Sequence, residues 1–154
     1  FSVGLPGITE LRPGNYVYFD RTQVALGAAS LRDCALTVLA RVVAAHKDRL
    51  VFDSGSKTLT SDGARGAGNT GYGAVFADVE DTSALDAGLN VERLSEEHAT
   101  VKVLGAGTRL RPGDLVRILP NHSCVVSNLA DEVILVDGTH VVDRLPVAAR
   151  GKNA

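Results

Sequence analysis

A histidine and a cysteine two positions apart are the residues of this chain best suited to hold a metal ion. His122 and Cys124 lie in the sequence ILPNHSC, residues 118–124, in which a proline ends an apolar run. Imidazole and thiolate are the ligand groups that zinc prefers. In an extended backbone these two side chains project to the same side, so both could bind one ion. Two protein ligands leave coordination positions open, which suits a catalytic metal better than a closed structural site.

The same pair has simpler interpretations, which the sequence leaves open. A free cysteine often packs as a small apolar side chain, and a single histidine is often a hydrogen-bonded polar group. The second cysteine, Cys34, lies in the sequence LRDCAL, residues 31–36, and we expect it to be a buried thiol. Two cysteines are too few for a disulfide scaffold, but a Cys34–Cys124 disulfide would remove Cys124 from metal binding.

A lysine among small hydroxyl side chains is a second candidate for chemistry. Lys57 lies in the sequence DSGSKTLTSD, residues 53–62. A lysine that acts as a Schiff-base nucleophile must be desolvated to lose its proton, whereas Lys57 lies in a polar loop. We therefore expect Lys57 to be a surface or substrate-facing charge. Asp53 and Asp62, at the two ends of this stretch, are expected to orient loop amides.

Three ionisable residues in a row interrupt an extended region at the sequence SEEH, residues 95–98. In a strand, Glu96 and His98 would share one face and Glu97 would point to the other. A solvated edge or a tight turn is the simpler interpretation, because glutamate is usually exposed. The functional alternative is a further ligand, or a partner that orients a ligand, near the His-x-Cys pair.

Composition excludes several classes of function. The chain has 154 residues and a formal net charge of −2, with no basic stripe that would suggest nucleic acid or an anionic membrane. It has no apolar run of membrane-spanning length and no signal-like N-terminus, so we expect a soluble, cytoplasmic protein. There is no methionine, even at position 1, which suggests a segment of a longer protein. The remaining histidines, His46 and His140, are expected to be exposed.

Short β-branched and aromatic runs separated by glycine and proline turns predict a mainly β domain. This spacing is typical of an antiparallel barrel or sandwich with short helices. The expected strands cover residues 16–20, 36–45, 49–53, 72–79, 89–94, 100–104, 114–119, 132–137 and 140–147.

Turn residues add detail to this arrangement. Leu-Arg-Pro-Gly occurs at residues 11–14 and again at 110–113, where we expect type II turns that lead into strands. Asp137-Gly138 predicts a hairpin turn. Two further segments are expected to be irregular or helical: residues 22–33 form a loop or short helix, and residues 81–88 a single capped helical turn. The glycine-rich stretch 62–73 is expected to be a mobile loop, because it lacks the features of a phosphate-binding loop.

Five of these segments, in this order, resemble the C-terminal domain of the metal-activated D-serine dehydratase / D-threonine aldolase family. The resemblance implies that residues 1–7 are the tail of a barrel domain or a linker, residues 8–151 the β domain, and 152–154 a C-terminal tail. The segments are ELRPGNYVYFD (10–20), DSGSK with a following DG (53–63), SEEH (95–98), LPNHSC (119–124) and VAARG (147–151). Two positions depart from the family pattern: Ala99 stands where glycine is common, and Leu145 where an aromatic residue often occurs.

The resemblance implies a fold-type III pyridoxal-phosphate enzyme whose cofactor lysine belongs to an N-terminal α/β barrel absent from this chain. His122 and Cys124 would bind the divalent metal, preferably zinc although manganese or magnesium could serve, and His98 and Glu97 match a family segment without an assigned step. The implied reaction converts D-serine to pyruvate and ammonia. The alternatives are D-threonine cleavage to glycine and acetaldehyde, or a non-catalytic β interaction domain. A homodimer is also implied, and the chain alone is expected to be inactive.

Overall fold

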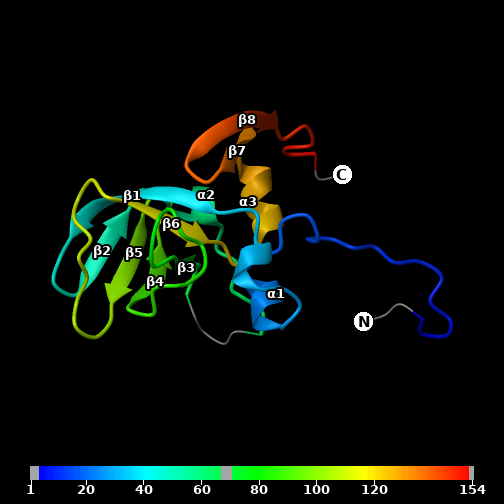
Figure 1. Ribbon diagram of the computed structural model, residues 1–154, viewed down its shortest axis with the longest axis horizontal. Helices are drawn as coiled ribbons and strands as arrows, with labels where there is room; N and C mark the ends of the chain where they lie inside the picture. The colour runs from blue at the N-terminus through cyan, green and yellow to red at the C-terminus, as the bar shows by residue number, and fades with distance from the viewer. Residues whose placement is uncertain (1–3, 67–70, 153–154) are drawn as a thin grey trace.

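A computed structural model describes residues 4–66 and 71–152, and its main element is a six-stranded antiparallel sheet (Figure 1). The strands lie side by side in the order β3-β6-β1-β2-β5-β4. They are β1 (Val38–Ala45), β2 (Arg49–Phe52), β3 (Ala74–Val75), β4 (Leu89–Leu94), β5 (Ala99–Val103) and β6 (Leu115–Leu119).

The sequence of β1 shows why these residues form a half-buried sheet. Val38, Ala40 and Val42 are buried, while the residues between them are exposed, which is the alternation of a strand with one face on the core. The first half of β1 pairs with β6 and the second half with β2, and a bulge lies between Val42 and Ala44. Bulges bend a strand, so β1 can serve both neighbours.

The two ends of the sheet approach each other and nearly close it into a barrel. The backbone N–H of Tyr72, just before β3, donates to the carbonyl of Val91 in β4 at 2.9 Å. Gly71 lies so close to this strand that a Cβ there would be 2.2 Å from the Val91 carbonyl oxygen. The predicted mainly β, barrel-like fold is therefore confirmed. The most completely buried apolar side chains form its core and include Phe52, Leu50, Leu59, Ile118, Leu119, Val42, Val75, Val91 and Val101.

Short helices accompany the barrel. They are α1 (Arg21–Ala25), the 3₁₀ turn η1 (Leu31–Asp33), α2 (Ser56–Leu59) and α3 (Ser123–Leu129). α1 and α3 lie next to each other in Figure 1, and α2 contacts α3. The prediction of a loop or short helix over residues 22–33 is confirmed, and so is a strand after it.

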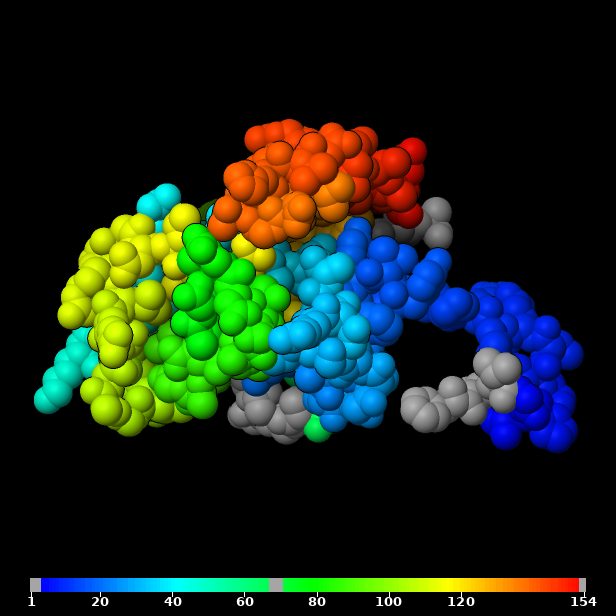
Figure 2. Space-filling view, in the orientation of Figure 1, coloured from blue at the N-terminus to red at the C-terminus, as the bar shows by residue number. Residues whose placement is uncertain are grey.

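A separate two-stranded hairpin extends beyond α3 (Figures 1 and 2). It consists of β7 (Glu132–Asp137) and β8 (His140–Pro146), which pair only with each other. The predicted turn is confirmed, since Gly138 adopts a φ of 58° between them. Much of the hairpin's apolar surface is exposed, at Ile134, Leu135, Val136, Val141, Val142 and Leu145.

Three local predictions are wrong. Residues 16–20 form a turn instead of a strand, because the N–H of Phe19 bonds the carbonyl of Asn15 at 2.9 Å. Residues 72–79 contain only the two-residue strand β3. Residues 81–88 contain no helix, since the Asp81 carboxylate bonds the N–H and the hydroxyl of Ser83 in a local turn.

Of the two proposed type II turns, only the second forms. Gly113 has a φ of 100°, and the N–H of Asp114 bonds the carbonyl of Arg111 at 3.1 Å, directly before β6. Gly14 does not adopt a positive φ, and no strand follows it. The N–H of Tyr16 instead bonds the carbonyl of Gly14 at 3.0 Å, next to the turn at residues 15–18.

Parts of two sequence predictions lie outside the described residues. These are residues 1–3 of the proposed tail or linker and residues 67–70 of the glycine-rich stretch. Within the described residues, no helix is both long enough and apolar enough to cross a membrane.

Candidate metal centre

His122 and Cys124 lie where β6 gives way to α3. Pro120 follows the last strand residue, His122 occupies the N-cap position with an extended backbone, and Cys124 lies in the first helical turn. The expected extended backbone is therefore correct for His122 but wrong from Ser123 onward. The two side chains therefore do not both project from an extended strand, and the binding of one ion by His122 and Cys124 stays a prediction.

A buried carboxylate from the N-terminal part of the chain explains why a helix begins here. One oxygen of Asp20 accepts the backbone N–H of Ser123 at 2.9 Å, and the other accepts that of Thr22 at 2.9 Å. The Ser123 hydroxyl in turn donates to the carbonyl of Phe19 at 2.8 Å. Asp20 thus satisfies N–H groups at the starts of both α1 and α3, a capping role that is usually performed by a local residue.

The imidazole of His122 is consequently free of helix capping and has a different partner. Its Nδ1 lies 2.8 Å from Oδ2 of Asp62, and both side chains are about half exposed. The expectation that Asp62 orients loop amides stays a prediction, since the structure shows its carboxylate bonded to this imidazole. Asp53 does accept an amide, the N–H of Arg41 at 2.6 Å, but that amide belongs to β1.

Asn121 connects the same two segments through the backbone. Its Nδ2 donates to the carbonyls of Asp62 at 2.9 Å and Gly71 at 2.8 Å, while its Oδ1 accepts from Arg21 at 3.3 Å. The side chain is 1% exposed. Burial lowers the pKa of Arg21, whose guanidinium also donates to the carbonyl of Gly73 at 3.1 Å. A fully bonded buried amide of this kind fixes the position of the residue that follows it.

The imidazole borders a polar pocket of about 310 Å³. The pocket is lined by Asp20, Thr22, Gln23, Asp62, Gly63, Arg65 and His122. Cys124 is not among these lining residues. Across residues 4–66 and 71–152, no three His, Cys, Asp or Glu side chains gather closely enough to hold a metal ion.

Both cysteines are free, which removes the competing disulfide. Cys34 is buried as predicted, and its burial, with the nearby charges of Asp20 and Asp33, raises the pKa of its thiol to about 11. Cys124 is exposed, and partial desolvation together with the charge of Asp20 raises its pKa. A bound divalent cation would act in the opposite direction, because a metal-coordinated thiol is deprotonated.

Lys57 is an exposed charge, as predicted, and it pairs with the SEEH segment. Its Nζ lies 2.7 Å from Glu97 and 2.9 Å from Glu96. Hydrogen bonds to both glutamates raise the pKa of Lys57, and the bond from Lys57 lowers that of Glu97. The lysine therefore stays protonated, which opposes a nucleophilic role. Since Glu97 and His98 do not line the pocket beside His122, their predicted link to the site stays a prediction.

The backbones of the DSGSK and SEEH segments are in direct contact. The N–H groups of Ser56 and Lys57 donate to the carbonyls of Ser95 and Glu96 at 2.8 and 3.1 Å. A Cβ on Gly55 would lie 2.3 Å from the Glu96 carbonyl oxygen, so only glycine fits. The two segments that stood out separately in the sequence are one structural unit.

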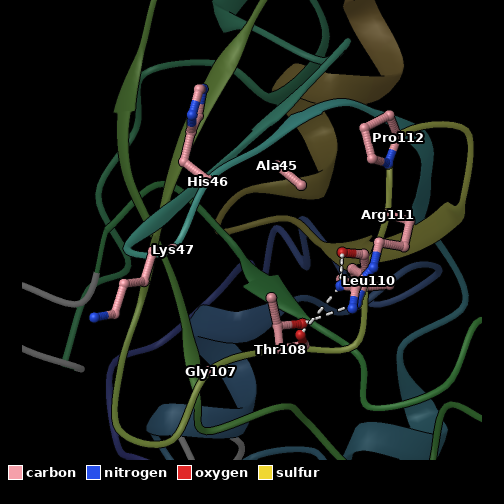
Figure 3. A pocket seen from close by; sticks show the side chains of 8 residues that line it. All are labelled: Ala45, His46, Lys47, Gly107, Thr108, Leu110, Arg111 and Pro112. Carbon is pink, nitrogen blue, oxygen red and sulfur yellow. Dashed lines mark hydrogen bonds between the residues drawn. The ribbon is translucent and has the colours of Figure 1, made fainter.

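A second pocket, of about 370 Å³, contains none of the predicted site residues (Figure 3). It is lined by Ala45, His46, Lys47, Gly107, Thr108, Leu110, Arg111 and Pro112. The guanidinium of Arg111 donates to the carbonyls of Thr108 and Leu110, and Lys47 points away from the other labelled side chains in Figure 3. The two cations do not converge, so the pocket is not built to bind an anion. His46 and His140 are exposed, as predicted.

Sequence analysis did not find Asp20 and Asn121. Asp20 directly precedes α1 and has the residue type of a helix N-cap, which is the only sequence signal for it. Its second role, at α3, joins residues that are far apart in the chain and leaves no local pattern. Asn121 was visible in the LPNHSC segment, but its bonds to two distant loops were not.

The fold has clear counterparts among solved structures of enzymes that act on D-hydroxy amino acids. The D-threo-3-hydroxyaspartate dehydratase of Delftia sp. HT23 superposes with a TM-score of 0.77 and 28% sequence identity over 92% of this chain. D-threonine aldolase from Filomicrobium marinum superposes with a TM-score of 0.71 and 27% identity over 94% of this chain. The fold and these neighbours define a β domain shared by dehydratases and aldolases.

The chain belongs to the putative serine dehydratase domain family, whose model matches residues 35–136. Among its relatives, an uncharacterized protein of Mycobacterium tuberculosis is 41% identical over 140 residues, which cover 87% of this chain and 97% of that protein. D-serine dehydratase of Dictyostelium discoideum is 26% identical over 88% of this chain. The resemblance stated from the sequence motifs is thereby confirmed.

The named enzymes are much longer than this chain. The chain covers 35% of the Dictyostelium dehydratase and 39% of the Delftia enzyme structure. D-threo-3-hydroxyaspartate dehydratase has also been solved with a histidine replaced by alanine and, in a metal-free form, with a cysteine two positions further along replaced by alanine.

Proposed function

We propose that this chain is the metal-binding C-terminal domain of a pyridoxal-phosphate- and zinc-dependent lyase that acts on D-3-hydroxy amino acids. The favoured reaction is the conversion of D-serine to pyruvate and ammonia. The observation that carries the proposal is the spacing of His122 and Cys124. It equals the spacing of the histidine and cysteine substituted in D-threo-3-hydroxyaspartate dehydratase, whose cysteine variant has been solved in a metal-free form.

The donor set fits zinc. A neutral imidazole nitrogen and a thiolate sulfur are ligands that zinc prefers, whereas a carboxylate in place of Cys124 would favour manganese or magnesium. The exposed thiol lies in the first turn of α3, and the imidazole borders the polar pocket. Two protein ligands leave open positions for water or a substrate hydroxyl.

When bound, the metal supplies Lewis-acid assistance at the substrate's β-hydroxyl, and pyridoxal phosphate supplies an electron sink. The residues of this chain bind and orient. His122 and Cys124 would hold the ion, and the pocket beside His122 is polar enough to admit a hydroxy amino acid. Arg65 brings a positive charge to a pocket that also contains the carboxylates of Asp20 and Asp62. That charge favours a carboxylate-bearing substrate in surroundings that would otherwise repel it.

The proposal includes two partners, an N-terminal barrel domain that carries the cofactor lysine and a second copy in a homodimer. The exposed apolar hairpin β7–β8 supports a partner, because an isolated hairpin is only marginally stable in water. Sedimentation equilibrium of the chain, alone and with the barrel supplied, tests both partners. A monomer in both samples would contradict the homodimer.

Metal analysis tests the site itself. Purified wild-type chain is expected to hold about one zinc per chain, and both His122→Ala and Cys124→Ala are expected to lose it. His46→Ala is the matched control, since His46 is an exposed histidine outside the pocket beside His122. Equal zinc in the wild type and both site variants would remove the metal site.

Activity distinguishes the reactions. When the N-terminal α/β barrel domain is supplied, we expect pyruvate from D-serine and little glycine from D-threonine. We expect neither product from this chain alone. Glycine and acetaldehyde from D-threonine as the main products would instead support the aldolase. Turnover by the isolated chain would contradict the assignment of the cofactor lysine to the barrel.

A non-catalytic interaction domain is the second candidate. It is favoured by the Mycobacterium tuberculosis relative, which this chain matches over 97% of its length. That relative is about as long as this chain, which leaves no length for the proposed N-terminal α/β barrel domain. Zinc binding that depends on His122, without activity in the presence of any barrel domain, would support this candidate.

A further inference from the structure

Among the described residues, the side chain of the proposed metal ligand His122 bonds Asp62, and this bond determines which of its two ring nitrogens carries the proton. Nδ1 lies 2.8 Å from Oδ2 of Asp62. An ionised carboxylate can only accept hydrogen bonds, so the proton of this bond must lie on Nδ1. In the neutral imidazole the other nitrogen, Nε2, then carries the lone pair. A metal requires a nitrogen with a free lone pair, so Nε2 is the atom available to it.

The backbone of Asp62 is bonded within its own loop. The N–H of Asp62 donates to the hydroxyl of Thr60 at 2.9 Å. Thr60 adopts a φ of 62°, a conformation that a β-branched residue rarely adopts. Such strain persists only where surrounding contacts impose it, and it is concentrated at functional sites.

A second hydrogen bond joins Asp62 to the residue next to His122. The carbonyl of Asp62 accepts a hydrogen bond from the side chain of Asn121, the residue that directly precedes His122. Asp62 is therefore joined to residues 121–122 twice, once through its backbone and once through its carboxylate. Two bonds between the same short segments fix the distance and also the rotation of the ring, which a single bond would not do.

The imidazole of His122 does not cap helix α3. His122 occupies the N-cap position of α3, where a side chain normally bonds the first helical amides, but its side chain makes no such bond. Asp20 bonds the N–H of Ser123 instead. The ring is left to Asp62 and to the pocket that both residues line.

We propose that Asp62 is a positioning residue that fixes His122 as the Nδ1–H tautomer and presents Nε2 to the metal. This inference rests on the proposed function, in which His122 binds the metal. Carboxylates that orient metal-binding histidines typically change metal affinity by about 10- to 100-fold when they are removed.

The first test needs no metal. Long-range ¹H–¹⁵N NMR of the ¹⁵N-labelled chain is expected to show a protonated Nδ1 and an unprotonated Nε2 for His122 at neutral pH. In Asp62→Ala the Nδ1–H loses its acceptor, and the Nε2–H form is expected to appear. A predominant Nε2–H form in the wild type, or an unchanged tautomer in Asp62→Ala, would overturn the inference.

The second test measures zinc affinity by competition with a chelator of known affinity. Asp62→Ala is expected to weaken binding about 10- to 100-fold, and Asp62→Asn less, because its amide oxygen can still accept from Nδ1. Asp48→Ala is the matched control, since Asp48 is an exposed carboxylate that pairs with the neighbouring Arg49. If the alanine variant does not fold, Asp62→Leu answers the question, because it keeps a side chain of similar size and removes the acceptor.

The outcomes separate this inference from the proposed function. Equal zinc affinity in the wild type and His122→Ala would contradict the proposed metal site itself. Loss of zinc in His122→Ala, with wild-type affinity in both Asp62 variants, would leave the metal site standing and overturn the role of Asp62. Loss of zinc in His122→Ala, together with weaker binding and a changed tautomer in Asp62→Ala, supports both.

Discussion

The carboxylate of Asp20 accepts the backbone N–H of Ser123, 103 positions further along the chain, at 2.9 Å. This bond begins α3 and so decides where the backbone turns between His122 and Cys124. The carboxylate is 1% exposed and also caps α1 through Thr22. A residue that is not one of the proposed ligands thereby positions both of them.

Removing this carboxylate is expected to destabilise the fold. In Asp20→Ala the buried N–H of Ser123 and the N–H of Thr22 lose their acceptor, and we expect the free energy of unfolding to fall by about 3 kcal/mol. Urea denaturation followed by circular dichroism measures this. Asp81→Ala is the control, because Asp81 also accepts two bonds but within one exposed turn, and its loss is expected to cost below about 1 kcal/mol. Equal losses in the two variants would contradict the linking role of Asp20.

Substitution of Gly55 is expected to separate the DSGSK and SEEH segments. A Cβ there would lie 2.3 Å from the Glu96 carbonyl oxygen, and backbone cannot move aside as a flexible side chain can. Gly55→Ala is expected to destabilise the protein by about 3 kcal/mol, measured as a lower thermal midpoint. Gly14→Ala has open space at its Cβ and is expected to change stability by less than about 0.5 kcal/mol. A Gly55→Ala variant as stable as Gly14→Ala would show that the two backbones can separate without cost.

The ion pair between Lys57 and Glu97 sets a pH window for this contact. Lys57 lowers the pKa of Glu97, so the ionised carboxylate of Glu97 stabilises the folded state. This stabilisation is complete above the pKa of the carboxyl in the unfolded chain, and it is lost as pH falls through the lowered pKa of the folded state. The glutamates raise the pKa of Lys57, so the stabilisation of the folded state by the protonated lysine is lost only as pH rises through that raised pKa. NMR titration is expected to show the Glu97 pKa returning toward its ordinary value in Lys57→Gln. No change in that variant would mean that the pair does not form in solution.

The two thiols are expected to differ in reactivity. Iodoacetamide should modify Cys124 in the native chain and Cys34 only after unfolding, because Cys34 is buried and its pKa is raised to about 11. Mass spectrometry of the modified peptides measures this. Zinc should slow the labelling of Cys124 at least about tenfold if the thiolate is a ligand, and His122→Ala should abolish that protection. Protection that survives in His122→Ala would argue against a shared ion.

Local sequence patterns were sufficient for much of the fold. The strands with regular alternation or a clear β-branched run, such as β1 and β4, were predicted within two residues of their ends. Gly113 and Gly138 marked turns correctly because glycine readily adopts a positive φ. The failures occurred where a distant or side-chain hydrogen bond competed with local preference, as in the turn at Phe19 and the turn at Asp81.

The sequence by itself determined the family, the barrel and the identity of the two candidate ligands, because these depend on residue types and spacings along the chain. Only the tertiary structure decided that Cys124 lies in a helix and that Asp62 is the partner of His122. The residues after Pro120 include two adjacent valines and resemble a strand, but the carboxylate of Asp20 satisfies the first helical amide. Bonds of this kind join residues brought together by the barrel, so no local window of sequence contains both partners.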